Sequence, residues 1–294
     1  MGHRWWPTAL AGVVLVCSSC ANDSPRATDE GRITRDRVAL VMVVESHETI
    51  APELALLFEA NRDSALDLLS AVLGVQRSRL VGLTLAEIED EYAEEWMIQQ
   101  LRLTAQDRYA EIVSLTDDEA TAHLCVARAD ELARTGHLVD LLFVLHGNSN
   151  GVWFADELRD IRLLTADFET RGIPVRALYQ TCCYGGDMID DWEGIGISAV
   201  NGSRGTNWVA MLAPVAFLQR WTGGAPFDEA VHGAMQDEIR AVRLYEQQLG
   251  LEGALLSPEQ IAESEPLVGG DLPQLLWLDF SASLAGTTRP LVSP

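Results

Sequence analysis

Short, continuously apolar runs separated by helical patterns constrain this fold more than any other feature of the chain. The clearest runs are VALVMVVES (38–46), Leu138 to Leu145, IPVRALYQTC (173–182) and GIGISAVNGSRG (194–205). Strands that are apolar at every position are typical of parallel sheets, because helices cover both of their faces. Parallel neighbours need long crossovers, so the stretches between the runs predict βαβ units. We expect an α/β fold, a three-layer sandwich with a mostly parallel central sheet.

The segments between these strands carry apolar residues at three- and four-residue spacing, and several end on a glycine. The run RLVGLTL (79–85) is expected to be a further strand. The segment that begins near Leu251 contains an apolar LLWLDF and is expected to be an extra strand or a packed extension. The predicted helices cover residues 52–74 with a break near Asn61, 86–114 with an acidic character, 116–136, 156–172, 207–224 and 226–250.

The beginning of the chain has the layout of a secretory signal. A basic start at His3 and Arg4 precedes an apolar stretch and then small residues, which predicts a signal peptide over 1–21. Cys20 follows two serines and resembles the lipidated cysteine of bacterial lipoproteins. We therefore expect an exported protein of the cell envelope, held at the membrane as a lipoprotein by a lipid on Cys20. The alternative is cleavage after Ala21, which would release a soluble secreted or periplasmic protein.

Beyond the signal, composition divides the chain into three parts. Residues 22–36 are polar without periodicity and are expected to be a linker. Residues 37–250 hold the alternating strands and helices and form the predicted domain, and 251–294 form a C-terminal extension. The net charge of −23 is spread along the chain, which argues against a nucleic-acid partner. No spacing among the histidines predicts a metal site.

Chemically useful residues follow two of the predicted strands. The strand 138–145 leads into His146-Gly147, and the strand 173–182 leads into Cys183 and two glycines. Carboxyl ends of parallel strands meet at one edge of a sheet, where reactive groups of such folds gather. A thiolate is a nucleophile, an imidazole can take its proton, and glycines let backbone N–H groups approach an oxyanion. The pattern predicts acyl transfer.

The order strand-His-Gly, helix, strand-Cys-x-Gly resembles the caspase, legumain and metacaspase superfamily of cysteine endopeptidases, over about residues 37 to 225. CYGGDM and the spacing from His146 to Cys183 carry this resemblance. It implies a caspase-like peptidase domain over 37–250, in which a thiol protease, a hydrolase, cleaves a protein or peptide substrate without a cofactor. It further implies Cys183 as the nucleophile, His146 as the general base, and backbone N–H groups of Gly147 and Cys183 as the oxyanion site.

Cys182 is the competing nucleophile. The family has a small residue two positions after its nucleophile, and if Cys182 were the nucleophile, Tyr184 would stand at that position. Successive strand residues point to opposite faces, so we expect Cys182 to face the core and Cys183 the crevice. Cys125 is expected in the core. Two other interpretations stay open: a catalytically inactive caspase-like binding module at the envelope, and a redox protein that uses the vicinal cysteines.

The resemblance also implies where substrate specificity is set. The matching positions hold Thr181 before the nucleophile and the segment SAVNGSRGTNW (198–208) on the next strand, particularly Ser198, Ser203 and Arg204. Thr181 replaces the acidic or amide residue that is usual there. The acidic residues at 187–191 would suit a basic substrate side chain, whereas Arg204 would suit an acidic one, and both alternatives stay open.

Overall fold

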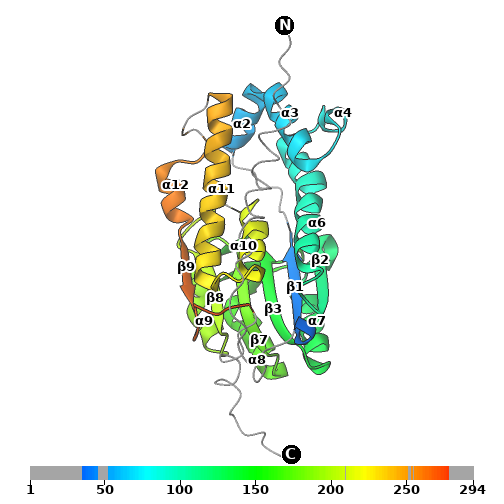
Figure 1. The fold of residues 1–294 in the computed structure, drawn as a ribbon, viewed down its shortest axis with the longest axis vertical. Helices are drawn as coiled ribbons and strands as arrows, with labels where there is room; N and C mark the ends of the chain where they lie inside the picture. Colours follow the sequence, from blue (N-terminus) through cyan, green and yellow to red (C-terminus); the bar gives the residue numbers. More distant parts are fainter. Residues whose placement is uncertain (1–34, 46–51, 209, 251–252, 254, 278–294) are drawn as a thin grey trace, which may run out of the picture.

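A six-stranded sheet forms the middle of the molecule (Figure 1). The computed structural model describes residues 35–45, 52–208, 210–250, 253 and 255–277. The strand order is β2-β1-β3-β7-β8-β9; the first five strands are parallel and β9 is antiparallel to β8. The strands are β1 (Val38–Val44), β2 (Glu111–Thr116), β3 (Leu138–Val144), β7 (Val175–Gln180), β8 (Ala199–Ser203) and β9 (Pro266–Gly269). The prediction of an α/β fold with a mostly parallel sheet is confirmed.

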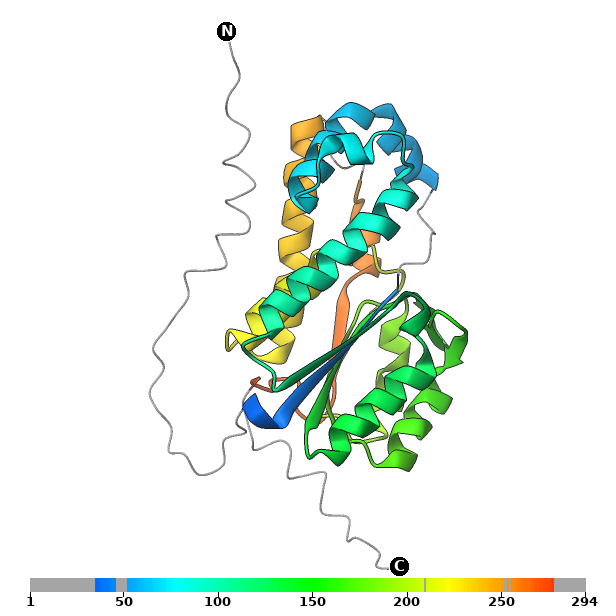
Figure 2. The same ribbon diagram turned by 90° about the vertical axis from the view of Figure 1, so that its right-hand side faces the viewer.

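Helices cover both faces of this sheet, as Figure 2 shows. One face packs against α7 (Ala122–Arg134), α8 (Ile161–Arg171) and α9 (Ile189–Glu193), and its core includes the buried Cys125. The other face packs against α6 (Glu94–Ala105), α10 (Ala213–Thr222) and α11 (Phe227–Leu249). Every residue of β1 is buried, which agrees with its unbroken apolar sequence.

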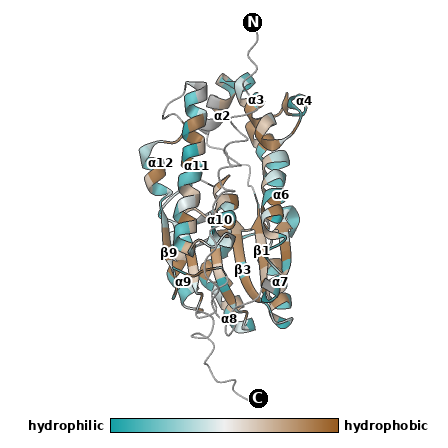
Figure 3. Cartoon of the chain, in the orientation of Figure 1, coloured by the Kyte–Doolittle hydropathy of each residue, from teal (hydrophilic) through white to brown (hydrophobic). Residues whose placement is uncertain are grey.

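The hydropathy colouring follows the same division between sheet and helices (Figure 3). The central strands are largely hydrophobic, whereas the helices mix polar and apolar positions along their length. Each helix therefore turns an apolar stripe to the sheet and a polar face to solvent. Among the described helices, none is both long enough and apolar enough to cross a bilayer.

A small helical unit follows β1, beyond the carboxyl end of that strand (Figure 1). Its helices share a hydrophobic cluster of their own. The break predicted near Asn61 is confirmed, and α3 ends at Gly74, whose φ of 67° is the left-handed conformation that glycine adopts most easily. The unit consists of α2 (Pro52–Ala60), α3 (Arg62–Leu73), α4 (Arg77–Leu80), α5 (Leu85–Ile88) and a π-helical turn (Glu89–Ala93).

The strand predicted over 79–85 is wrong. Leu80 ends α4, and Thr84 begins α5 with a capping box. The Thr84 N–H donates to Glu87 Oε2 at 2.6 Å, and the Glu87 N–H donates to Thr84 Oγ1 at 3.2 Å. A threonine followed three residues later by glutamate is the usual sequence pattern of such a helix start.

The helix predicted up to residue 114 ends at Ala105, and the helix predicted to start at Thr116 begins at Ala122. Residues 111–116 form β2, which is an edge strand among the described strands and pairs with β1. The helix α7 starts after Thr121, whose side chain accepts the N–H of Leu124 at 3.2 Å. An edge strand that is mostly half-exposed lacks the continuous apolar run that identified the central strands.

Three short strands between β3 and α8 form a separate small sheet: β4 (Gly147–Asn148), β5 (Gly151–Trp153) and β6 (Leu158–Asp160). The helix predicted from residue 156 therefore begins at Ile161, after Asp160, which accepts the N–H groups of Arg162 and Leu163. It ends at Gly172 in a left-handed conformation, as its sequence predicts.

The predicted C-terminal extension contributes to the central sheet. Its described part contains α12 (Pro258–Glu263) and β9, which pairs with β8 from Val200↔Gly269 to Ser203↔Pro266. The sheet thus continues past residue 250, and the expectation of an extra strand is confirmed. The predicted signal peptide with Cys20 and the linker up to residue 34 lie outside the described residues.

Candidate functional site

The tips of β3 and β7 lie side by side at the carboxyl edge of the sheet. Their pairing continues past the strand ends, because the N–H of Thr181 donates to the carbonyl of Phe143 at 2.9 Å. A Cβ added to Gly147 would lie 3.0 Å from Cys182 Cβ and 3.2 Å from the Cys183 carbonyl oxygen. The backbone of Gly147, the residue after His146, therefore packs directly against the cysteine pair.

The two adjacent cysteines occupy different environments. Cys182 is 0 % exposed and belongs to the core that α7, α8 and α9 cover, whereas Cys183 is partly exposed. The expectation that Cys182 fills the core is confirmed. Burial raises the pKa of the Cys182 thiol far above its ordinary value, although an N–H of Leu145 bonds to it. Both thiols are free, so the structure contains no disulfide between them.

The Cys183 thiol has one defined hydrogen-bond donor outside its own residue. The backbone N–H of Asn207 lies 3.4 Å from Cys183 Sγ. Burial raises the pKa of this thiol; the Asn207 N–H opposes that rise by stabilising the thiolate, and the charge of Glu263 adds to it. At neutral pH the group is therefore a thiol, and nucleophilic chemistry at Cys183 needs a base to remove its proton.

The backbone turns sharply directly after Cys183. Tyr184 has a φ of 57°, which few residues other than glycine adopt, and its N–H donates to the Gly205 carbonyl at 2.7 Å. Gly185 then begins a short 3-10 helix, Gly185–Met188, and contacts Gly202 of β8. A Cβ on Gly202 would lie 2.0 Å from the Gly185 carbonyl carbon, so this close approach of two backbones requires a glycine.

The loop after β8 places Asn207 beside the thiol, and the end of α12 holds this loop. The Asn207 side-chain amide donates to the Thr181 carbonyl at 2.9 Å. The Trp208 N–H donates to Ser264 Oγ at 2.8 Å, and the Trp208 indole N–H donates to Glu263 at 3.0 Å. Asn207 belongs to the predicted specificity segment 198–208 but was not singled out there, and Ser264 was not predicted, because it belongs to no motif and lies far away in the chain.

A buried carboxylate fixes the far end of the same loop. Glu238 of α11 accepts the backbone N–H groups of Met211, Leu212 and Ala213 at 3.0, 3.0 and 2.7 Å. These donors lie at the start of α10, where N–H groups lack partners within the helix. Burial raises the pKa of Glu238 in spite of these three bonds.

The four residues predicted to set specificity lie in four different environments. Ser203 lies at the site, where its hydroxyl oxygen is 2.8 Å from the carbonyl oxygens of both Cys182 and Gly205 and donates its one hydrogen to one of them. Thr181 is buried, with its hydroxyl 3.4 Å from the Phe143 carbonyl. Arg204 points away to an exposed ion pair with Glu265 at 3.0 Å.

Ser198 is the prediction that the structure contradicts. It precedes the first residue of β8, whereas Cys183 and Ser203 lie at the carboxyl end of the sheet. Ser203 is five residue steps beyond Ser198, a distance of about 16 Å along an extended strand. The prediction treated the segment 198–208 as one site, although a strand places its two ends at opposite edges of the sheet.

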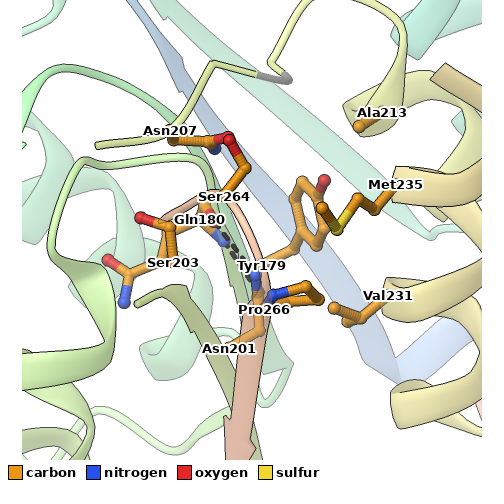
Figure 4. A pocket seen from close by; sticks show the side chains of 10 residues that line it. All are labelled: Tyr179, Gln180, Asn201, Ser203, Asn207, Ala213, Val231, Met235, Ser264 and Pro266. Atoms are coloured by element: carbon orange, nitrogen blue, oxygen red, sulfur yellow. Dashed lines mark hydrogen bonds between the residues drawn. The ribbon is translucent and has the colours of Figure 1, made fainter. Parts of the chain in front are cut away.

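A small polar pocket lies behind Asn207 and Ser203 (Figure 4). Gln180 and Tyr179 of β7 line it together with Met235 of α11, and the cavity volume is about 20 Å³. Asn201 fixes the backbone of Gln180. The Asn201 Oδ1 accepts the N–H of Gln180, and the Asn201 Nδ2 donates to the carbonyl of Gln180, both at 3.0 Å. Sequence patterns gave no sign of this pocket, because its lining combines residues of the three strands β7, β8 and β9, the two helices α10 and α11, and the segments between them.

Acidic residues gather at the carboxyl ends of β1 and β2, next to the tip of β3. The Glu45 N–H donates to the Val144 carbonyl at 3.0 Å. Burial raises the pKa of Glu45 to about 7, and the neighbouring charges of Glu94, Asp117 and further carboxylates add to the rise. His47, which follows in the sequence, lies outside the described residues.

The site thus brings together a partly exposed thiol, a glycine-rich turn and the histidine-bearing tip of the neighbouring strand. Cys183 carries a partly exposed thiol, His146 follows β3 directly, and glycines adjoin both residues. These are the groups that acyl transfer needs. No protein-family model matches the sequence, and no curated protein matches it.

Proposed function

We propose that this protein is a cysteine endopeptidase with a caspase-like fold, in which Cys183 and His146 form the catalytic dyad. The observation that carries the proposal is the contact between the tips of β3 and β7. There Gly147 packs against the backbone of Cys183, whose thiol is partly exposed. The order of the His-Gly strand, the crossover helix α8 and the Cys strand is the order that the superfamily has.

The proposed reaction proceeds through an acyl-enzyme. His146 takes the proton of Cys183 as the sulfur attacks the peptide carbonyl, and the carbonyl electrons move to oxygen. Backbone N–H groups of Gly147 and Cys183 bind that oxyanion. When the intermediate collapses, the C–N bond breaks and His146 gives its proton to the leaving amine. Water, deprotonated by His146, then releases the acid and restores the thiol.

The raised pKa of Cys183 supports a base-assisted mechanism. A thiol that stays protonated at neutral pH attacks only when a base removes its proton. A single hydrogen bond from the Asn207 N–H does not replace that base. His146 is therefore assigned the proton transfer, and its loss should be as damaging as the loss of Cys183.

The same raised pKa favours a second candidate, a catalytically inactive caspase-like binding module. In such a module the thiol would stay neutral and unused while the fold bound a partner. Under either function we propose export to the cell envelope with a lipid on Cys20. Mass spectrometry of the cell-derived protein tests this point: an unmodified N-terminus at or beyond Asn22 would contradict the lipid anchor.

Digestion of a peptide library separates the two functions. The wild-type protein should cleave library peptides, Cys183→Ala should cleave none, and Cys182→Ala should keep the wild-type cleavage pattern. Cys182→Ala is the matched control, because it removes a thiol from the neighbouring position in the core. Cleavage that survives in Cys183→Ala, or no cleavage by wild-type protein, would contradict the peptidase proposal.

A further inference from the structure

One peptide group of the loop after β8 carries a hydrogen-bond donor to the Cys183 thiol. The Asn207 N–H, which lies 3.4 Å from Cys183 Sγ, belongs to the same peptide group as the Thr206 carbonyl. The carbonyl and the N–H of a planar trans peptide point in opposite directions, so a group that holds the carbonyl also fixes the direction of the N–H. This direction matters, because a hydrogen bond weakens steeply when the donor turns away from its acceptor.

The Ser264 hydroxyl contacts the chain on both sides of this N–H. It accepts the Trp208 N–H at 2.8 Å and donates to the Thr206 carbonyl at 3.4 Å, and the shorter bond provides most of the anchoring. A hydroxyl has one hydrogen and two lone pairs, so it can make both bonds at once. Ser264 is 4 % exposed and ends α12. It thus holds Asn207 through both neighbouring residues, from a buried position.

The first residues of the loop follow the segment between α12 and β9 through their backbone. The Arg204 N–H donates to the Glu265 carbonyl at 3.0 Å. The Gly205 N–H donates to the Glu263 carbonyl at 2.8 Å. Beyond Gly205, the Ser264 hydroxyl continues this contact. Loss of the hydroxyl therefore loosens the loop at the residue whose N–H faces the sulfur.

The hydroxyl can act on the thiol without changing any charge near it. Burial raises the pKa of Cys183, the Asn207 N–H opposes this rise, and the charge of Glu263 adds to it. Replacement of Ser264 leaves every charge in place, so a change in the acidity of Cys183 would report on the N–H donor. The titratable groups on the elements around the thiol are His146, Tyr184, Asp187, Arg204, Glu263 and Glu265.

We propose that the Ser264 hydroxyl is a positioning group that holds the Asn207 N–H on the Cys183 sulfur and thereby stabilises the thiolate. It acts through the peptide between Thr206 and Asn207 and bonds neither the sulfur nor a substrate. Its consequence for peptide cleavage rests on the proposed function, because a cysteine peptidase attacks as the thiolate. Its effect on the acidity of the thiol does not depend on that function.

Alkylation of Cys183 by iodoacetamide, followed by mass spectrometry at a series of pH values, tests the proposal. Ser264→Ala should raise the pKa of Cys183 by about 1, as the partial loss of a hydrogen bond to a charged atom allows. At pH 7 it should slow alkylation about 3-fold, because a more basic thiol forms fewer but more nucleophilic thiolates. The slowing should shrink as the pH rises toward the pKa. Slowing by the same factor at every pH would indicate altered access to the thiol and would overturn the proposal.

Two sets of variants separate the hydroxyl from general effects on stability. Ser257→Ala removes the hydroxyl that caps the other end of α12, where Ser257 accepts the Gln260 N–H at 3.2 Å, and it should leave the pKa of Cys183 unchanged. Ser264→Thr and Ser264→Val have the same shape and differ in the hydroxyl, so Cys183 should be more acidic in the threonine variant. An equal pKa in these two variants, or an equal rise in Ser257→Ala and Ser264→Ala, would refute the proposal.

A peptide-cleavage assay on the same proteins distinguishes this proposal from the peptidase. If Ser264→Ala raises the pKa of Cys183 and wild-type protein cleaves no peptide, the positioning role stands and the peptidase fails. If wild-type protein cleaves peptides and Ser264→Ala leaves the pKa unchanged, the positioning role fails alone. If both hold, Ser264→Ala should slow cleavage at neutral pH, and Ser257→Ala should not.

Discussion

The backbone N–H of Asn207 lies 3.4 Å from the sulfur of Cys183, although 24 positions separate the two residues in the chain. This contact ties the loop after β8 to the tip of β7. The loop is held at one end by Ser264 and at the other by Glu238. The geometry around the thiol therefore depends on helices α11 and α12 as well as on the sheet.

The two cysteines should respond differently to replacement by alanine. Cys183→Ala should reduce peptide cleavage by at least about 1,000-fold with little change in Tm, because it removes the proposed nucleophile from a partly exposed position. Cys182→Ala should keep cleavage and lose about 1–2 kcal/mol of unfolding free energy, because it leaves a small cavity in the core. Urea unfolding and a cleavage assay measure both. If Cys183→Ala kept peptide cleavage and Cys182→Ala lost it, Cys182 and not Cys183 would be the nucleophile.

The close approach of Gly185 and Gly202 predicts a strong effect of one methyl group. Gly202→Ala would place a Cβ 2.0 Å from the Gly185 carbonyl carbon, and should cost about 3 kcal/mol or more of unfolding free energy together with catalytic activity. Gly205→Ala is the control, because its nearest neighbour is a side-chain atom at 3.4 Å. That variant should stay within about 0.5 kcal/mol of wild type by urea unfolding. Equal stability of the two variants would contradict this packing.

The carboxylate of Glu238 should stabilise the start of α10 and the site loop. Glu238→Gln replaces one acceptor oxygen by an NH₂ group that faces backbone donors, and should cost about 1–3 kcal/mol of unfolding free energy. Glu229→Gln changes an exposed carboxylate on the same helix and should change stability by less than about 1 kcal/mol. Chemical denaturation compares them. A Glu238→Gln variant as stable as Glu229→Gln would show that these bonds contribute little.

The raised pKa of Glu45 predicts that the stability of the fold depends on pH. Its pKa is raised to about 7 in the folded protein from an ordinary value of 4.5, so the folded state holds the proton more tightly than the unfolded state does. The resulting contribution to stability is present below pH 4.5 and is lost as pH rises through about 7. Glu45→Gln should therefore raise the Tm at pH 8, by about 2–4 °C for each kcal/mol of relieved repulsion, and leave it nearly unchanged at pH 4.5.

Thermal scans between pH 4.5 and 8 check this prediction. The wild-type Tm should fall relative to that of Glu45→Gln as pH rises, with most of the difference developing between pH 5 and 7. Glu111→Gln is a matched control, because it neutralises an exposed carboxylate of β2 away from the carboxyl end of the sheet. A pH-independent difference between wild type and Glu45→Gln would contradict the raised pKa.

The central strands were predictable because a strand that is buried on both faces is apolar at nearly every position of its sequence. β1, β3 and β7 appear as unbroken apolar runs, and Gly74 and Gly172 mark helix ends by their left-handed conformation. β2 was not predicted, because an edge strand with half-exposed residues has no continuous apolar run. The strand expected over 79–85 failed because a capping box at Thr84 determines the local structure.

The candidate site was predictable only in the parts that adjoin a strand end. His146 and the cysteine pair follow apolar strands directly, and strand alternation gave the inward direction of Cys182. Asn207 and Ser264 reach the site through a loop and a helix end, whose geometry depends on tertiary contacts. Ser198 was misplaced because a resemblance identifies a segment but does not say where its strand begins.

Labelling with a peptidyl acyloxymethyl ketone, followed by peptide mapping, tests the proposed dyad most directly. This reagent alkylates a cysteine that a neighbouring base activates within a substrate site. The peptidase proposal predicts that wild-type protein carries the label on Cys183, that Cys182 stays unlabelled, and that His146→Ala slows labelling at least about 100-fold at neutral pH. A folded wild-type protein that stays unlabelled at Cys183, or labelling that His146→Ala leaves unchanged, would contradict it.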